Sequence, residues 1–150
     1  MIAFPDTSFL CALYVRQDNS AAAAAYFKAM PEALHVSSLM LYEFRQSVRF
    51  HVWLHGRDKN KGYPLAIVEV ALGKLQANME AGAVVPVTAD WPDVHRLAET
   101  LSKRHTLTGG HRSLDVLHVA TALHLGARDF LTFDANQRKL AASGKLKVKP

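Results

Sequence analysis

The chain has 150 residues, of which 49% are hydrophobic and 21% are charged, and its formal net charge at pH 7 is +5. This composition excludes a disordered chain and suits about one domain with its own hydrophobic core. The single cysteine, Cys11, excludes an intrachain disulfide. No apolar stretch is long enough for a membrane span, and the start of the chain lacks the pattern of a signal peptide. We therefore expect a cytoplasmic protein.

Short apolar segments alternate with helical patterns along the chain. We expect strands over residues 2–4, 34–36, 83–87, 128–133 and 146–148. We expect helices over residues 8–13, 18–30, 37–55, 65–81, 90–105, 113–125 and 135–142. Residues 56–62 and 106–111 are expected to be connections. Strands separated by helices predict a three-layer α/β/α sandwich with a central, mostly parallel sheet.

Two details of the first strand and helix follow from residue type. Ser8 is a suitable N-cap for the first helix. Pro5 lacks the amide hydrogen that a central strand needs, so we expect it either at the last pairing position of its strand or at a point where the sheet is disturbed.

Four carboxylates lie where this fold would bring them together. Asp6 and Asp134 follow strands, and Glu43 and Asp115 lie on apolar helices. Burying an unpaired carboxylate costs several kcal/mol, so a cluster needs protons or a bound cation. Oxygen ligands favour Mg²⁺ or Mn²⁺, which commonly serve phosphate chemistry. The pattern predicts a metal-dependent nuclease and, without metal, raised carboxyl pKa values.

Each of these acids also has a purely structural interpretation. Asp115 could complement a helix dipole, and Glu43 could lie on the surface of an amphipathic helix. Asp134 could be an N-cap, and Asp6 a turn residue. Their joint occurrence in this order favours the site.

The chain resembles a known family in several segments. These are Phe4-Pro5-Asp6-Thr7-Ser8-Phe9-Leu10, Glu43 on the third helix, Leu114-Asp115-Val116-Leu117-His118-Val119-Ala120-Thr121-Ala122-Leu123, and Phe130-Leu131-Thr132-Phe133-Asp134. They look like the PIN-domain nucleases, and most closely the VapC-type toxin ribonucleases of toxin–antitoxin pairs. The match spans nearly the whole chain, which implies a single PIN-like nuclease domain over residues 1–150.

The resemblance implies roles for individual residues. The catalytic, metal-binding acids would be Asp6, Glu43, Asp115 and Asp134. Hydroxyls of Thr7 or Ser8 and of Thr132 would lie beside them. Family members often carry a further acid shortly after the one at Asp134, and in this chain that region holds Asn136, a difference that bears on a second metal ion.

The resemblance also implies an activity and partners. The protein would be an endoribonuclease that uses Mg²⁺ or Mn²⁺ to hydrolyse RNA, leaving 5′-phosphate and 3′-hydroxyl ends. It would form a homodimer and bind a small antitoxin protein. Apolar side chains available for such contacts are Tyr26, Phe27, Phe50, Trp53 and Leu54.

Basic side chains at three places could contact RNA or only the solvent. Candidates for phosphate contacts are Arg45, Arg49 and Arg112. His51 and His55 have metal-like spacing but no accompanying glutamate, so we interpret them as surface residues or a minor RNA contact. Lys145, Lys147 and Lys149 alternate along the last strand and favour protection of a sheet edge.

Three other functions are compatible with parts of the pattern. A non-catalytic PIN-like domain that binds RNA or a partner would be expected to lack one or more acids. A response-regulator-type phosphoryl-transfer protein would need clustered acids after the first strand, where Asp6 stands alone. Cleavage of DNA rather than RNA stays open.

Overall fold

The computed structural model describes residues 2–150. In chain order its elements are β1 (Ala3–Pro5), α1 (Thr7–Tyr14), α2 (Ser20–Ala29), β2 (Leu34–Ser37), α3 (Ser38–Arg57), α4 (Leu65–Glu80), β3 (Val84–Val87), α5 (Trp91–Gly109), α6 (Ser113–His124), β4 (Asp129–Leu131), α7 (Ala135–Ser143) and β5 (Lys147–Lys149). Within this range, no helix is long and apolar enough to cross a membrane.

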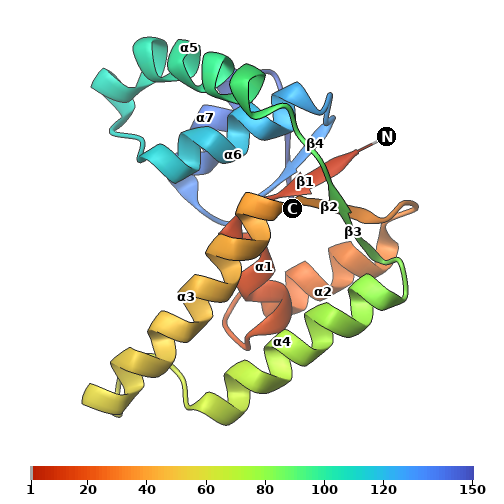
Figure 1. The fold of residues 1–150 in the computed structure, drawn as a ribbon, viewed down its shortest axis with the longest axis vertical. Coiled ribbons are helices and arrows are strands. Elements are labelled where there is room, and N and C mark those ends of the chain that lie inside the picture. The colour runs from red at the N-terminus through yellow and green to blue at the C-terminus, as the bar shows by residue number, and fades with distance from the viewer. Residues whose placement is uncertain (1) are drawn as a thin grey trace.

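The strands form one sheet in the order β3-β2-β1-β4-β5, and every pairing is parallel. Helices α1 to α4 cover one face and α5 to α7 the other (Figure 1). This confirms the expected three-layer α/β/α sandwich.

The strand order also contains a switch point. The chain adds β2 and β3 on one side of β1 and then returns to add β4 on the other side. Open α/β sheets bind ligands at the carboxyl ends of strands beside such a switch.

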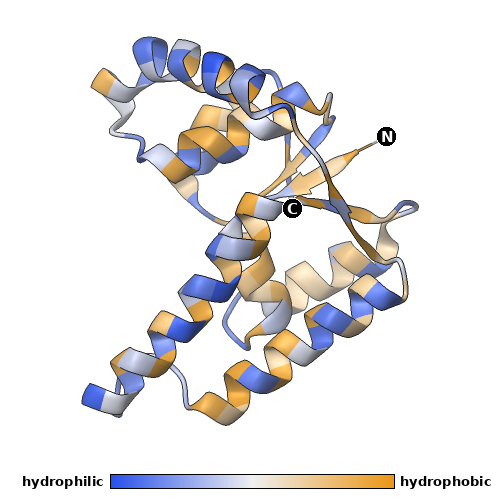
Figure 2. Ribbon diagram, viewed as in Figure 1, coloured by the Kyte–Doolittle hydropathy of each residue, from blue (hydrophilic) through white to orange (hydrophobic). Residues whose placement is uncertain are grey.

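Helix α6 is the buried centre of its layer. Val116, Val119 and Ala120 are buried, and the helix packs against both α5 and α7. In Figure 2 α6 is mostly apolar in colour, whereas α5, which lies on the outside, is mostly hydrophilic. A residue on the inner part of α6 is therefore held by packing on several sides.

Several boundaries differ from those expected by one or two residues, and two differences are more informative. Helix α5 continues to Gly109, through most of the loop expected over residues 106–111, and ends at Gly110, whose φ is 64°. The N-cap of α1 is Asp6 rather than Ser8. Pro5 does lie at the last position of β1, opposite Leu131, and the next amide, that of Asp6, donates to the Leu131 carbonyl at 2.9 Å. Pro5 therefore costs the sheet only the one hydrogen bond that an amide at its own position would have donated.

Helices α3 and α4 form an arm that projects from the sheet (Figure 1). The connection at its tip is held by the carbonyl of His51, which accepts from Tyr63 N at 3.1 Å, and by His55 Nδ1, 3.1 Å from the Lys61 carbonyl. Gly62 has a φ of 63°, and a Cβ there would lie 1.9 Å from the His51 oxygen. Both histidines thus belong to the tip of the arm.

The exposed apolar side chains of the arm match the expectation in part. Phe50 and Trp53 are 49% and 51% exposed, whereas Tyr26 and Phe27 pack against the core and Leu54 is half-buried. The lysine-rich last strand, β5, is at an edge of the sheet, and its Lys147 and Lys149 are exposed. This agrees with edge protection.

Candidate active site

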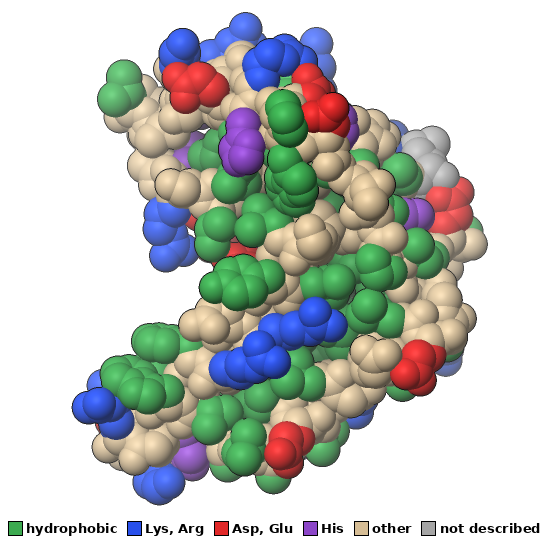
Figure 3. Space-filling model, in the orientation of Figure 1, with side chains coloured by type: hydrophobic (Ala, Val, Ile, Leu, Met, Phe, Trp, Pro, Cys, Tyr) green, Lys and Arg blue, Asp and Glu red, His purple; other side chains and the backbone are tan. Residues whose placement is uncertain are grey.

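One cleft of about 220 Å³ contains all four acids singled out in the sequence. It opens where the carboxyl ends of β1 and β4 meet the first turns of α1, α6 and α7 and the inner face of α3. Its lining residues are Asp6, Thr7, Ser8, Glu43, Ser47, Arg112, Asp115, His118, Asp134 and Gln137. Figure 3 shows the molecule hollowed between the upper helices and the α3–α4 arm.

Asp6 is the most buried of these acids, with 2% of its surface exposed. Its Oδ1 accepts from the Phe9 amide at 2.9 Å and from Ser8 Oγ at 2.6 Å, and Thr132 Oγ1 donates to Oδ2. Burial raises the pKa of Asp6, and these hydrogen bonds partly offset the rise. Asp6 is thus a helix cap and a lining residue of the cleft.

The hydroxyls of Ser8 and Thr132 join the Asp6 carboxylate to the segment after β4. Ser8 Oγ accepts from the Phe133 amide at 2.9 Å, and Thr132 Oγ1 accepts from the Asp134 amide at 2.9 Å. Because each hydroxyl accepts from a backbone N–H, its single proton is available to Asp6. The Ser8 and Thr132 hydroxyls thus connect the end of β1 to the end of β4 and orient the Asp6 carboxylate.

Asp134 is the N-cap of α7. Its Oδ1 accepts from the amides of Asn136 and Gln137, both at 2.8 Å. Asp134 Oδ2 has no hydrogen bond within residues 2–150. One oxygen therefore serves the helix while the other is left for the cleft.

Glu43 reaches the cleft from α3, and its Oε2 accepts from Thr7 Oγ1 and from His118 Nε2. Burial acts to raise the pKa of Glu43, but the bonds from His118 and Thr7 and the charges of His118 and Arg112 hold it below the usual value. The expectation that clustering raises these pKa values is therefore wrong for Glu43. Donors from neighbouring helices outweigh the effect of burial.

Asp115 lies in the first turn of α6, with its side chain 18% exposed. Gln137 Nε2 donates to Oδ1 at 3.2 Å, and Arg112 Nε lies 3.5 Å from Oδ2. The Arg112 side chain is 85% exposed and places a positive charge at the rim of the cleft. Arg45 and Arg49, the other two candidates for phosphate contacts, do not line the cleft.

The donor set suits a hard divalent cation, since the four acids offer only oxygen. Across the described range 2–150, however, no three or more His, Cys, Asp or Glu side chains are grouped closely enough to hold a metal ion. The acids share a cleft but are turned toward separate partners. By their chemistry these oxygen donors fit Mg²⁺ or Mn²⁺.

Three lining residues, Ser47, His118 and Gln137, were missed in the sequence, and Asn136 lies outside the lining. His118 and Gln137 contact Glu43 and Asp115 directly. A histidine three residues after Asp115, on an otherwise apolar helix, was the available signal for His118. The Asn136 side chain does not line the cleft, and only its backbone amide reaches Asp134.

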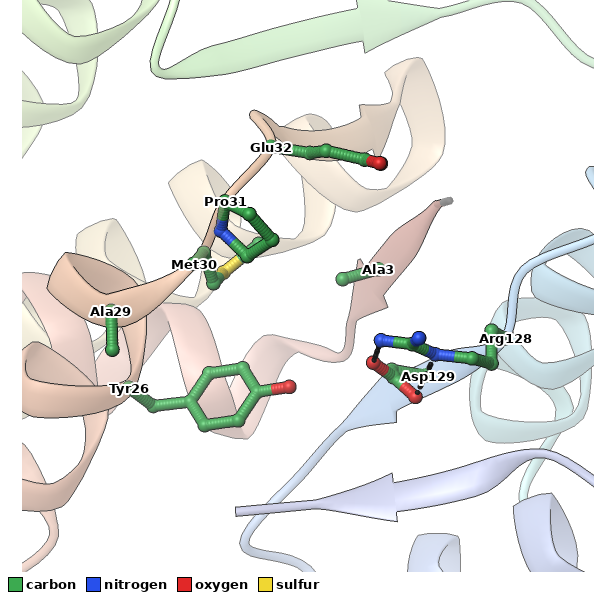
Figure 4. A pocket seen from close by; sticks show the side chains of 8 residues that line it. All are labelled: Ala3, Tyr26, Ala29, Met30, Pro31, Glu32, Arg128 and Asp129. Atoms are coloured by element: carbon green, nitrogen blue, oxygen red, sulfur yellow. Dashed lines mark hydrogen bonds and ion pairs between the residues drawn. The ribbon is translucent and has the colours of Figure 1, made fainter.

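A second cavity, of about 270 Å³, lies at the opposite, amino ends of β1 and β4. Figure 4 shows Tyr26 pointing toward Arg128 and Asp129 there. Arg128 already donates to Asp129 at 2.8 and 2.5 Å, and none of the four acids lines this cavity. The acidic cleft is therefore the better candidate for catalysis.

Comparison with known proteins agrees with the fold. The family model for the PIN domain matches residues 3–143. No curated protein matches the chain.

Three solved structures illustrate the likeness. VapC20 of Mycobacterium tuberculosis, a toxin that cleaves the sarcin–ricin loop, is 22% identical, with a TM-score of 0.64 and 99% of each chain covered. FitAcB of Neisseria gonorrhoeae is 19% identical, with a TM-score of 0.61 and 99% of this chain and 97% of that one covered. VapBC2 of Rickettsia felis, bound to a DNA fragment from its promoter, is 14% identical, with a TM-score of 0.65 and coverage of 99% and 98%. At these identities the likeness shows the fold.

Proposed function

The chain belongs to the PIN-domain family of nucleases, and on that premise we propose that it is a metal-dependent endoribonuclease, the toxin of a toxin–antitoxin pair. One observation carries the proposal. Four carboxylates from distant parts of the sequence line a single cleft at the switch point of the sheet. We take residues 1–150 as one nuclease domain that acts in the cytoplasm.

In this proposal Asp6, Glu43, Asp115 and Asp134 are the catalytic acids and hold Mg²⁺ or Mn²⁺. When bound, such an ion polarises the phosphate, lowers the pKa of water and stabilises charge on the leaving oxygen. Asp6 is held ready by Ser8 and Thr132, whose hydroxyl protons both point to it. Asp6 would therefore be oriented by the protein before the ion arrives.

RNA is the proposed substrate. The net charge of +5 favours binding of a polyanion. Arg112 at the cleft rim can contact a phosphate as it swings away from Asp115. VapC20, which has a similar fold, is described as a toxin that cleaves the sarcin–ricin loop. The products would carry 5′-phosphate and 3′-hydroxyl ends.

A small antitoxin and a second copy of this chain are the proposed protein partners. Several chains of similar fold come from VapBC or FitAB assemblies. On this chain, Phe50 and Trp53 stack with ring centroids 5.4 Å apart on the exposed face of the arm. Exposed aromatic pairs of this kind are typical anchors of an interface.

The test is incubation of the purified protein with total RNA, with Mg²⁺ or with a chelator, followed by mapping of the cut ends. We expect discrete cuts with 5′-phosphate ends that need the metal and disappear in Asp6→Asn. Asp18→Asn, an exposed acid outside the cleft, is the matched control and should cut normally. RNA binding without cleavage would instead support the non-catalytic alternative, and cuts only in DNA would change the substrate.

A further inference from the structure

His118 joins the two helical layers at the cleft. It lies on α6, on one side of the sheet, and its Nε2 donates to Oε2 of Glu43, which lies on α3 on the other side. His118 is 1% exposed, so packing fixes its ring. The bond connects two elements that are 75 residues apart in the sequence.

Stability alone does not explain a histidine at position 118, because its other ring nitrogen is left without a hydrogen bond in the described range. Its Nδ1 is buried and has no hydrogen-bond partner within residues 2–150. A buried polar atom without a partner destabilises a fold, and an apolar side chain of similar size would fill the same place without that penalty. The Nε2 contact to Glu43 is therefore the feature that distinguishes histidine from leucine here.

The arrangement uses only one oxygen of Glu43. Thr7 Oγ1 from α1 and His118 Nε2 from α6 both donate to Oε2, whereas Oε1 has no hydrogen bond in the described part of the chain. A carboxylate held in this way by one oxygen cannot rotate freely, and its other oxygen is left for a ligand of the cleft.

We propose that His118 is a positioning residue that, with Thr7, fixes Glu43 Oε2 and so presents Oε1 to a divalent cation. The inference rests on the proposed function and extends it to two residues that do not themselves contact the ion. Neighbours that hold a metal-binding side chain typically change metal affinity by about 10- to 100-fold when they are removed.

The test measures Mn²⁺ binding by calorimetry on the full-length protein, without RNA, for wild type, His118→Leu, His118→Gln and Thr7→Val. His118→Leu should weaken Mn²⁺ binding about 10-fold or more while leaving the melting temperature in chelator unchanged or higher. Glutamine carries an N–H donor at a similar reach and should restore most of the affinity. Thr7→Val removes the other donor and should also weaken binding.

His51→Leu is the matched control, because His51 also has a buried, unpartnered Nδ1 but does not line the cleft. It should bind Mn²⁺ like wild type. The inference is overturned if His118→Leu binds Mn²⁺ as wild type does, if Gln and Leu lose affinity equally, or if Thr7→Val keeps full affinity. Wild-type protein that neither binds Mn²⁺ nor cuts RNA would overturn the proposed function as well, so the two failures are distinguishable.

Discussion

Asp6 and Asp134 cap the helices that follow two adjacent parallel strands, β1 and β4. Each accepts backbone N–H groups through Oδ1, and Thr132 bonds to both segments. Because the two strands are parallel neighbours, both N-cap carboxylates lie at the same edge of the sheet. The capping role and the proposed metal role are therefore compatible in the same residues.

Asp134 allows these two roles to be separated. Asp134→Asn keeps an oxygen acceptor for the Asn136 and Gln137 amides, so the free energy of unfolding should change by less than about 0.5 kcal/mol. Asp134→Ala removes the cap and should cost about 1 kcal/mol. Both variants should lose nuclease activity. Denaturant titration and an RNA cleavage assay check this, and a fully active Asp134→Asn would exclude Asp134 from the site.

Asp115 should matter for metal and little for stability. Its contacts are a 3.2 Å bond from Gln137 and a 3.5 Å approach of an exposed arginine. We expect Asp115→Asn to leave the metal-free protein as stable as wild type or slightly more stable, because a negative charge leaves the cleft. Mn²⁺ should raise the wild-type melting temperature and raise that of the variant much less. An equal response to Mn²⁺ in both proteins would contradict the site.

The buried Asp129 at the start of β4 should make stability depend on pH. The hydrogen bonds from Arg128 hold the pKa of Asp129 below the usual 3.8. A carboxyl group whose pKa is lower in the folded state stabilises the fold above its unfolded pKa, and that stabilisation is lost as pH falls through the folded value. The difference in unfolding free energy between wild type and Asp129→Asn should thus be greatest near neutral pH and shrink below about pH 4.

Asp58 is the control for this experiment. Its side chain is 42% exposed and lies 3.8 Å from Lys61, a surface ion pair that contributes little. Asp58→Asn should show a small difference at every pH. A pH-independent difference for Asp129→Asn would show that its loss acts through packing rather than through charge.

Trp53 should contribute to association and not to the stability of the monomer. Its ring is half exposed, stacks on Phe50 and lies 4.3 Å from the Arg57 guanidinium. Replacing an aromatic anchor commonly costs 2 kcal/mol or more of binding energy, so Trp53→Ser should weaken self-association or antitoxin binding by roughly 10-fold or more. Light scattering and co-purification with the antitoxin measure this.

Leu107→Ser provides the comparison, because Leu107 is 95% exposed at the far end of α5. It should leave association unchanged. If Trp53→Ser associates as wild type does, the exposed face of the arm is not the interface.

The sequence by itself determined the class of fold and the position of the acids along the chain. Hydrophobic periodicity and glycine or proline positions are local signals, so the alternation of strands and helices could be read directly. Asp6 and Asp134 were placed at the carboxyl ends of their strands for the same reason, and Pro5 at a strand end. The end of α5 was expected about four residues too early, although the Gly109-Gly110 pair is a local stop signal and Gly110 is the residue at which the helix ends.

Only the tertiary structure decided which partner each acid has. His118 and Glu43 are 75 residues apart, and Gln137 and Asp115 are 22 apart, so no local pattern could pair them. The sequence predicted mutual repulsion and raised pKa values, but the pKa of Glu43 is lowered because donors arrive from two other helices. The pKa of a carboxyl group depends on the atoms that surround it in space, and in this protein the folding of distant segments around the cleft supplies them.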